Sequence, residues 1–441
     1  MSIAETRSDT RAWDGLVQED RVHRSLYTDP AIFEMEMTKV FGATWVYLGH
    51  ETEIPEPNDF RTGRLGLRPI ILTRDGDGQV HALLNRCRHR AARVCREACG
   101  SADKFTCGYH GWVYANDGQL LAAPFPKAFG PDFDTSDFSL ARIPRVSSYR
   151  GFLFGTLNLA AADLRDHLGP AAEFLDQWID RSPQGRIVVG RSPHRMVYRG
   201  NWKLAYDNAG DGYHPGFSHE SLIIMAAHRA PADENTDMLA VYAAGDPDSH
   251  GDKNYDLGNG HTLLDQRPGI FPSKWMVNRP QPGREYFEAK LRGAAGDGLA
   301  ERMLEEAVGS GMNLNIFPNL LVIGNQIQVV EPLDVRRTQL TWYPTTIQGV
   351  PPDINTLRLR TQEDFPSFGE VDDNANFEEC QQGLEIPEIE WIYINRHLRT
   401  GVEETDERGV VSGPLTDDLH LRAYYRQWKR LMSDEPELVV E

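Results

Sequence analysis

Residues 201–219 read NWKLAYDNAGDGYHPGFSH, and they place Asp211, His214 and His219 within nine residues of one another. Residues three apart share one face of a helix, so we expect Asp211 and His214 to point the same way. Pro215-Gly216 interrupts helical geometry and can bring His219 back beside His214. Two imidazoles and one carboxylate, with open positions, form a typical ligand set for non-haem Fe(II). The stretch therefore predicts a mononuclear iron site.

The carboxylate of this site has two candidates. Asp211 lies beside the histidines, and Asp373 lies in the pair Asp372-Asp373, which opens a helical pattern over 371–392 that holds up to Gly383. The residues alone leave both candidates open. The alternative for the two histidines is a hydrogen-bonded structural pair without metal. Asn208, in the same stretch, could position substrate or a ligand water, or simply satisfy the backbone.

A second group of metal-type ligands lies about a hundred residues upstream. It consists of Cys87-Arg88-His89 and Cys107-Gly108-Tyr109-His110, separated by seventeen residues. Two Cys and two His suit either a structural zinc or a Rieske [2Fe-2S] cluster. Each loop here contributes one of each type, which favours the Rieske arrangement, with both Cys on one iron and both His on the other. We therefore expect Cys87, His89, Cys107 and His110 to hold a cluster that passes electrons to the mononuclear iron.

The charge of the chain limits its partners. Its 441 residues carry a net charge of −19, which argues against a nucleic-acid binder. We find no apolar run long enough to cross a membrane and no signal peptide at the N-terminus. Five cysteines, an odd number, fit a reducing cytoplasm. Arg88, Arg90 and Arg93 crowd the first ligand loop, as a docking face for an acidic electron donor or as ordinary surface charge.

The pattern of apolar residues indicates an α+β fold in three parts. Residues 1–41 form an N-terminal segment, helical from Asp29-Pro30, that we expect to pack on the catalytic domain. Residues 42–160 read as a small all-β domain with strands near 44–49, 68–74, 79–85 and 151–158 and a hairpin over 111–122. Residues 161–441 read as a larger domain of antiparallel sheet covered by helices, with helices at 163–180 and 284–309, strands at 187–200 and 314–344, and a loop-rich region at 226–275.

Several motifs together resemble one known family. The segments CRHR, CGYHGW, GNWKLAYDN, DGYHPGFSH, NIFPNL and DDNANFEECQ are similar to those of Rieske non-haem iron ring-hydroxylating oxygenase α subunits. The resemblance covers most of the chain. It implies that Asp373 joins His214 and His219 on the iron, and that Asp372 is a cap or supporting group. It also implies that Asp211 links the iron histidine to a cluster histidine of a neighbouring subunit, because the two metal sites of one chain lie too far apart.

The resemblance further implies an assembly and a reaction. It implies a head-to-tail homotrimer, often with a smaller β subunit (α3β3), and electrons from NAD(P)H through a reductase, sometimes with a ferredoxin. Dioxygen and an aromatic substrate meet at the iron, with dihydroxylation, monohydroxylation and O- or N-demethylation all represented. The competing interpretations are a Rieske electron carrier, which leaves about 280 residues unexplained, and a zinc-bearing structural subunit.

Overall similarity favours aromatic acids such as benzoates, salicylates or phthalates as substrates. A buried substrate carboxylate needs a cationic or hydrogen-bonding partner, and the bidentate guanidinium of arginine suits it. Arg396 and Arg279 are the candidates. For the lining of the substrate pocket we expect the following side chains: Asn208, Phe217, Ile223, Ile224, Met225, Ile316 and Phe317.

Overall fold

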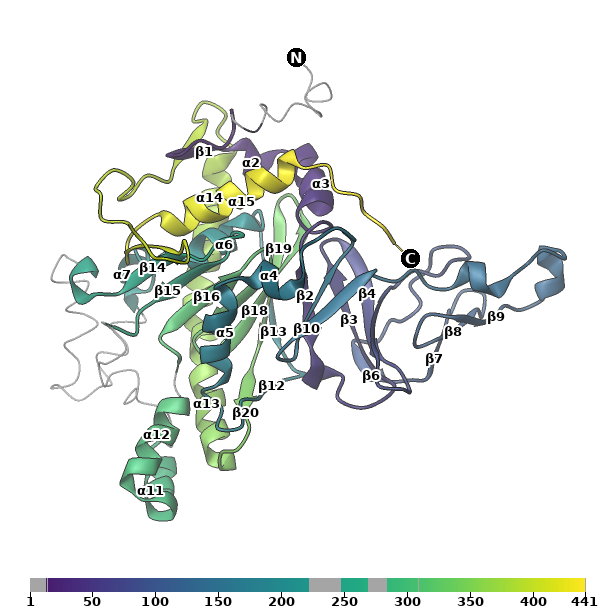
Figure 1. The fold of residues 1–441 in the computed structure, drawn as a ribbon, viewed down its shortest axis with the longest axis horizontal. Helices are drawn as coiled ribbons and strands as arrows, with labels where there is room; N and C mark the ends of the chain where they lie inside the picture. The colour runs from purple at the N-terminus through teal and green to yellow at the C-terminus, as the bar shows by residue number, and fades with distance from the viewer. Residues whose placement is uncertain (1–12, 14, 222–246, 269–283, 308, 441) are drawn as a thin grey trace. The chain divides into compact units, whose positions relative to one another are not determined.

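The computed structural model describes residues 13, 15–221, 247–268, 284–307 and 309–440. The chain forms two compact units. The small unit comprises residues 34–167 and 434–441, and the large unit comprises residues 1–33 and 168–433. Figure 1 shows the ribbon with its element labels.

The small unit is longer at both ends than the expected range 42–160. Residues 34–41 belong to it, although the sequence pattern suggested that 1–41 would pack on the larger domain. The C-terminal tail also returns to the small unit. The N–H of Val439 donates to the carbonyl of Leu157 at 2.9 Å, and Lys39 pairs with Glu435 at 2.8 Å. Such long-range contacts of a short tail leave no periodic trace in the sequence.

Three antiparallel sheets build the small unit. Their strand orders are β5-β4-β3-β6, β7-β8-β9 and β10-β11-β2. The strands are β2 (Val46–His50), β3 (Asp59–Leu65), β4 (Arg68–Arg74), β5 (Val80–Leu84), β6 (Cys99–Ser101), β7 (Lys104–Thr106), β8 (Val113–Ala115), β9 (Leu120–Ala122), β10 (Arg145–Tyr149) and β11 (Phe152–Thr156). The expected hairpin over 68–85 forms, because Asp75 caps the turn by accepting from the N–H groups of Asp77 and Gln79. Both metal-ligand loops leave from these short strands.

A nine-stranded antiparallel sheet forms the large unit, in the order β13-β19-β18-β17-β16-β15-β14-β23-β22. Its strands are β13 (His194–Tyr198), β14 (Lys253–Asp256), β15 (Thr262–Asp265), β16 (Met312–Ile316), β17 (Leu320–Ile323), β18 (Gln326–Asp334), β19 (Arg337–Tyr343), β22 (Glu404–Thr405) and β23 (Val411–Pro414). The consecutive strands expected over 314–344 are β16 to β19. β12 (Ile187–Val189) pairs separately with β20 (Thr345–Ile347).

Two strands of this sheet fall in the region expected to be loop. β14 and β15 form a hairpin within 253–265 and extend the sheet from β16 toward β23. Each strand has four residues, and the connection passes through Gly258, Asn259 and Gly260, all with positive φ. A four-residue strand is too short to show a clear alternation of apolar side chains.

The large unit also contains helices, namely α2 (Ser25–Thr28), α5 (Ala171–Ile179), α6 (Lys203–Ala209), α7 (Pro215–Ser218), α11 (Arg284–Ala295), α12 (Asp297–Ala307), α13 (Pro352–Asp364), α14 (Glu370–Leu384) and α15 (Leu419–Ser433). Most of α3 (Pro30–Lys39) and of α4 (Leu164–Leu168) belongs to the small unit. Gly169-Pro170 separates α4 from α5, and Gly296 separates α11 from α12. The sequence analysis missed α15, drawn in yellow in Figure 1, which contacts α6, β14 and β15.

Among the described residues, no helix has the length and apolar character that a bilayer crossing requires.

Candidate active site

Three side chains of the large unit converge on one point. The Oδ1 atom of Asp373 lies 3.6 Å from Nε2 of His214 and 3.4 Å from Nε2 of His219. One ligand atom from each residue lies within 4.8 Å of the others, which is close enough to share a metal ion. His219 and Asp373 are buried, at 6% and 3% exposure. Within the described residues, Asp373 Oδ1 has no hydrogen-bond donor, as expected for an atom reserved for a metal.

The outer nitrogen of each imidazole faces a second carboxylate. Nδ1 of His214 lies 3.3 Å from Oδ2 of Asp211, and Nδ1 of His219 lies 3.5 Å from Oδ2 of Asp372. A metal-binding histidine usually gives its other N–H to such a partner, which fixes the ring orientation and raises ligand basicity. The two rings therefore present Nε2, rather than Nδ1, to the shared point.

The backbone brings Asp211 and His214 together by a different route from the one expected. They do not share a helical face, because α6 ends at Ala209 and His214 is the residue that precedes α7. Pro215 begins this short helix rather than breaking one, as suits a residue without an N–H group. The single turn of α7 then returns His219 to the side of His214, with ring centroids 5.2 Å apart.

The charged groups of this site shift one another's pKa values. Burial alone would raise the pKa of Asp211, but the hydrogen bond and charge of His214 hold it below its usual value. Burial lowers the pKa of His214, yet Asp211 and then Asp373 raise it overall. Burial raises the pKa of Asp373 despite the opposing effects of His214 and His219. A divalent cation at the shared point would neutralise this excess of buried carboxylate charge.

The second ligand set lies in two loops of the small unit that have the same backbone hydrogen bonds. Ala91 N–H donates to the Cys87 carbonyl at 3.1 Å, and Gly111 N–H donates to the Cys107 carbonyl at 3.0 Å. Cys87 N–H donates to the Ala92 carbonyl and Cys107 N–H to the Trp112 carbonyl, both at 2.8 Å. Ala91 and Gly111 both have positive φ, at 62° and 70°. Two matched turns therefore present one cysteine and one histidine each.

The side chains of these loops suit a cluster with two Cys and two His ligands. Cys87 and Cys107 are free thiols at 2% and 1% exposure. The rings of His89 and His110 lie 4.4 Å apart between centroids, and Nδ1 of His89 is buried without a hydrogen-bond partner among the described residues. Since a buried polar atom without a partner is costly, these donors fit a bound iron–sulfur group.

Tyr114 adds a contact that the sequence analysis did not anticipate. Its hydroxyl lies 3.2 Å from the Sγ atom of Cys87 and accepts a hydrogen bond from the N–H of Arg88 at 3.1 Å. Tyr114 lies in β8 and is fully buried. Its position seven residues after Cys107 is the only sequence signal, and this spacing alone does not reveal a contact with the other loop.

The other residues expected to line the substrate pocket or to bind its carboxylate lie in different surroundings. Asn208 is hydrogen-bonded to Asp373. Phe217 is 71% exposed, whereas Ile316 and Phe317 are buried in the core. The guanidinium of Arg396 donates to the Thr416 carbonyl and hydroxyl, and it stacks 3.8 Å from the ring centroid of Tyr213. Four candidates lie outside the described residues: Ile223, Ile224, Met225 and Arg279.

The remaining cysteines divide into two kinds. Cys95 is buried beside the cluster loops, as expected for a structural thiol, but Cys99 and Cys380 are exposed. The two exposed thiols lie at solvent-facing positions, Cys99 in β6 and Cys380 in α14.

Two protein-family models match this chain, one for each of the two sets of candidate ligands. Residues 44–148 match the Rieske [2Fe-2S] domain, and residues 187–434 match the catalytic domain of the ring hydroxylating alpha subunit. The second match covers more than half of the chain and contains all of the proposed iron ligands. The first contains both cysteine–histidine loops.

Individual relatives and solved structures are similar over nearly the whole chain. Toluate 1,2-dioxygenase subunit alpha from Pseudomonas putida is 36% identical over 84% of this chain and 82% of its own. The 2-halobenzoate 1,2-dioxygenase large subunit from Burkholderia cepacia is 34% identical over 90% and 86%. The solved structure of naphthalene 1,2-dioxygenase with indole in its active site is 25% identical, with a TM-score of 0.77 over 95% of this chain and 94% of the other.

Proposed function

This chain belongs to the family of ring-hydroxylating oxygenase alpha subunits, and on this premise we propose that it oxygenates an aromatic acid. It is the terminal oxygenase of an aromatic-hydroxylating system, with a Rieske cluster and a mononuclear iron as cofactors. The Pseudomonas putida and Burkholderia cepacia relatives are named for toluate and 2-halobenzoate, both aromatic carboxylates, and for 1,2-dioxygenation. These names support dihydroxylation of a benzoate-type ring.

The observation that carries the proposal is the presence of two separate donor sets in one chain. In the small unit, we assign Cys87 and Cys107 to one cluster iron and His89 and His110 to the other. In the large unit, we assign His214, His219 and Asp373 to the mononuclear iron. The cluster supplies electrons one at a time, and the iron, with open positions, supplies the place where dioxygen is activated.

The chain's own side chains have distinct parts in this proposal. Asp211 and Asp372 hold the outer nitrogens of the iron histidines and so orient both rings. Asn208 donates a hydrogen bond to Asp373 and restrains the carboxylate. Asp211 keeps a 29% exposed side chain, so a partner chain can reach it. A histidine of a neighbouring subunit's cluster, equivalent to His89 or His110, would contact Asp211 there.

For the assembly we propose a head-to-tail homotrimer, with a smaller β subunit and with a reductase, alone or with a ferredoxin, as electron source. The exposed arginines around the first cluster loop support a docking site for an acidic donor. This arginine surface consists of Arg86, Arg88, Arg90, Arg93 and Arg96. None of the five forms an ion pair within the described part of the chain. Residues 34–167 carry sixteen basic and sixteen acidic side chains, so the net charge of −19 resides elsewhere.

We place the protein in the cytoplasm. All five cysteines are free thiols, which suits a reducing compartment, and the reductase would draw on cytoplasmic NAD(P)H.

Product analysis tests the function. The protein, loaded with iron and supplied with NAD(P)H and a reductase, should convert a benzoate-type acid to an oxygenated product that incorporates dioxygen. Fully loaded protein should contain about three irons per chain. Faster turnover of neutral hydrocarbons than of acids would contradict the substrate class. Zinc in place of iron, without the visible colour of a cluster, would contradict the whole proposal, whereas a demethylated product would redirect it to the monooxygenase alternative.

An electron-carrier function, the other alternative, leaves the catalytic-domain match over residues 187–434 without a purpose. The isolated protein would then transfer electrons without consuming substrate, which the same assay detects.

A further inference from the structure

The helix that leads to Asp211 ends at a place where its carbonyl groups need outside partners. The last carbonyls of a helix have no N–H partner within it. Here the carbonyl of Asp207 accepts a hydrogen bond from Nε2 of His420 at 3.0 Å. The carbonyl of Gly210 accepts one from Nδ2 of Asn254 at 2.8 Å. Side chains of α15 and β14 therefore satisfy the C-terminal end of α6.

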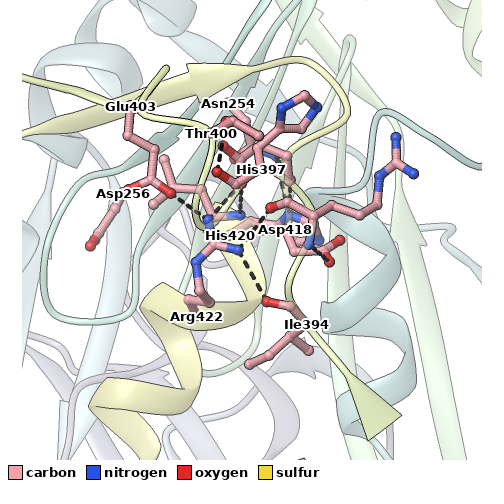
Figure 2. A network of polar contacts seen from close by, with 12 residues as sticks. Asn254, Asp256, Ile394, His397, Thr400, Glu403, Asp418, His420 and Arg422 are labelled. Atoms are coloured by element: carbon pink, nitrogen blue, oxygen red, sulfur yellow. Dashed lines mark hydrogen bonds and ion pairs between the residues drawn. The ribbon is translucent and has the colours of Figure 1, made fainter. Parts of the chain in front are cut away.

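His420 and Asn254 also contact each other. Nδ2 of Asn254 lies 3.1 Å from Nδ1 of His420, and Figure 2 shows the two side chains side by side in a larger polar network. In the neutral tautomer with a proton on Nε2, His420 donates to Asp207 and accepts from Asn254. The carbonyl of Asp417 lies 3.2 Å from the same Nδ1. Burial lowers the pKa of His420, in agreement with a neutral ring.

The two glycines that flank Asp211 are packed too closely for a side chain on this side. A Cβ atom at Gly210 would lie 2.8 Å from the His420 ring, and one at Gly212 would lie 2.5 Å from the Leu415 carbonyl. The residues on either side of Asp211 thus lie directly against the first turn of α15 and the segment before it. Asp211 lies just beyond the end of α6, between these two contacts. Its own N–H donates to the Asn208 carbonyl at 3.0 Å.

We propose that His420, assisted by Asn254, is a positioning residue that fixes the direction of the Asp211 carboxylate. From this position, Oδ1 of Asp211 accepts the Tyr213 N–H at 2.6 Å and Oδ2 faces Nδ1 of His214 at 3.3 Å. The inference rests on the proposed role of Asp211 between the two metal sites. It adds a residue on the C-terminal helix, some two hundred positions away, that touches neither metal.

A second link between α15 and α6 provides a matched control. Tyr424 and Tyr425, on α15, donate hydrogen bonds to the side chain of Asp207 rather than to its carbonyl. Tyr425→Phe removes a buried hydroxyl from the same helix and leaves the carbonyl contact of His420 in place. A general loosening of α15 should therefore appear in Tyr425→Phe, whereas a loss of positioning should not.

Three variants test the proposal in the intact protein. His420→Phe keeps an aromatic ring, although a larger one, but removes the donor to Asp207. His420→Gln keeps a donor of similar reach, and Tyr425→Phe is the control. The first readout is amide hydrogen exchange over residues 207–214 in metal-free protein. The second is the rate at which the pre-reduced cluster is reoxidised by dioxygen and benzoate in a single turnover. Thermal unfolding of each variant measures general destabilisation.

We expect His420→Phe to speed exchange over 207–214 and to slow reoxidation about tenfold, as for other residues that orient metal ligands. His420→Gln should restore both, and Tyr425→Phe should change neither. Normal exchange or normal reoxidation in His420→Phe would overturn the proposal. Equal slowing in all three variants, in proportion to lost thermal stability, would overturn it as well.

Two further results keep the inference separable from the proposed function. If His420→Phe does not fold, Asn254→Ala removes the Gly210 contact and is judged by the same two readouts. If Asp211→Asn itself reoxidises its cluster at the normal rate, the bridging role of Asp211 is wrong. The exchange experiment then still decides whether His420 fixes the end of α6.

Discussion

Nδ1 of His219 lies 3.5 Å from Oδ2 of Asp372, while Nε2 of the same ring lies 3.4 Å from Oδ1 of Asp373. Two consecutive carboxylates thus face opposite nitrogens of one imidazole. Because Asp373 also faces His214, it is the inner carboxylate and Asp372 the outer one. Substitution of the two aspartates should therefore have different effects on iron binding.

We expect Asp373→Ala to empty the mononuclear site and leave the cluster spectrum unchanged. Asp372→Asn should retain iron with roughly 10- to 100-fold weaker affinity, the usual cost of losing a partner of a metal-binding histidine. Iron content and an iron titration of metal-free protein measure both. If Asp372→Ala empties the site while Asp373→Ala does not, the motif has been aligned one residue off.

Tyr114→Phe should preserve the cluster and lower its reduction potential. The hydroxyl contact to Cys87 at 3.2 Å stabilises the more electron-rich, reduced state, since hydrogen bonds to the sulfurs help set the potential. A hydrogen bond worth about 1 kcal/mol corresponds to roughly 40 mV for one electron. Potentiometric titration of the visible spectrum gives the value.

Tyr109→Phe is the matched control for this experiment. Tyr109 is 59% exposed and lies next to His110. It therefore shares the loop but, within the described residues, forms no hydrogen bond with the thiol of Cys87 or Cys107. An equal shift in both variants would show that the Tyr114 hydroxyl has no specific effect.

The candidate ligands of the site could be proposed from the sequence more readily than their geometry. The residue types and spacings around Cys87, Cys107 and His214 indicate metal binding even when the fold is unknown. The helical argument for Asp211 and His214 was wrong, because it used spacing alone. The end of α6 is set by His420, which is more than two hundred residues away and has no sequence pattern that points to this contact.

A similar limit explains the missed elements of the fold. Long strands such as β18 and β19 show their apolar pattern in the sequence, whereas β14 and β15 have four residues each and are held by pairing with β16 and β23. The helix α15 was overlooked although its apolar positions recur every three to four residues, as in Tyr424, Trp428 and Leu431. That helix carried a usable signal, but the four-residue strands did not.

Asp207 should make the stability of the protein depend on pH. Burial raises its pKa to about 7, against hydrogen bonds from Tyr27 and Tyr425 and the charge of Lys203, which lower it. An acid with a raised pKa in the folded state favours folding below its unfolded pKa of about 4, and this contribution is lost as pH rises toward 7. The loss amounts to at most roughly 4 kcal/mol.

The variant Asp207→Asn should therefore show a flatter loss of stability between pH 4 and pH 7 than the parent protein, because an amide has no proton to release. The measurement is the free energy of unfolding by denaturant at several pH values in that range, on metal-free protein. Parallel curves for parent and variant would mean that Asp207 titrates normally.

Reversing charges on the arginine surface should weaken binding of the electron donor. We expect Arg90→Glu with Arg93→Glu to raise the reductase concentration needed for half-maximal cluster reduction, and to reduce the dependence of that rate on salt. Arg336→Glu with Arg337→Glu, on two exposed arginines of the large unit, is the charge-matched control. Chemical reduction by dithionite should be equal in all proteins, and an effect of this control as large as that of Arg90→Glu with Arg93→Glu would argue against a specific surface.

Asp211 gives the most demanding test of the proposed electron path. Its Oδ2 atom faces His214 at 3.3 Å, its Oδ1 atom accepts the Tyr213 N–H at 2.6 Å, and its side chain remains 29% exposed. Each carboxylate oxygen has two lone pairs, so Asp211 can still accept a hydrogen bond from a partner chain's cluster histidine. In Asp211→Asn, the amide nitrogen replaces one of these oxygens and cannot accept.

We therefore expect Asp211→Asn to retain the cluster spectrum, the mononuclear iron and the assembly state, yet to slow single-turnover reoxidation of the cluster by about 100-fold or more. Iron content and the visible spectrum are measured on the same sample as the reoxidation rate. The variant Asp372→Asn serves as the comparison, because it removes the corresponding partner of His219 without lying between the two metal sites. If Asp211→Asn instead loses its mononuclear iron while Asp373→Ala keeps it, Asp211 is the iron ligand and the assignment of Asp373 is wrong.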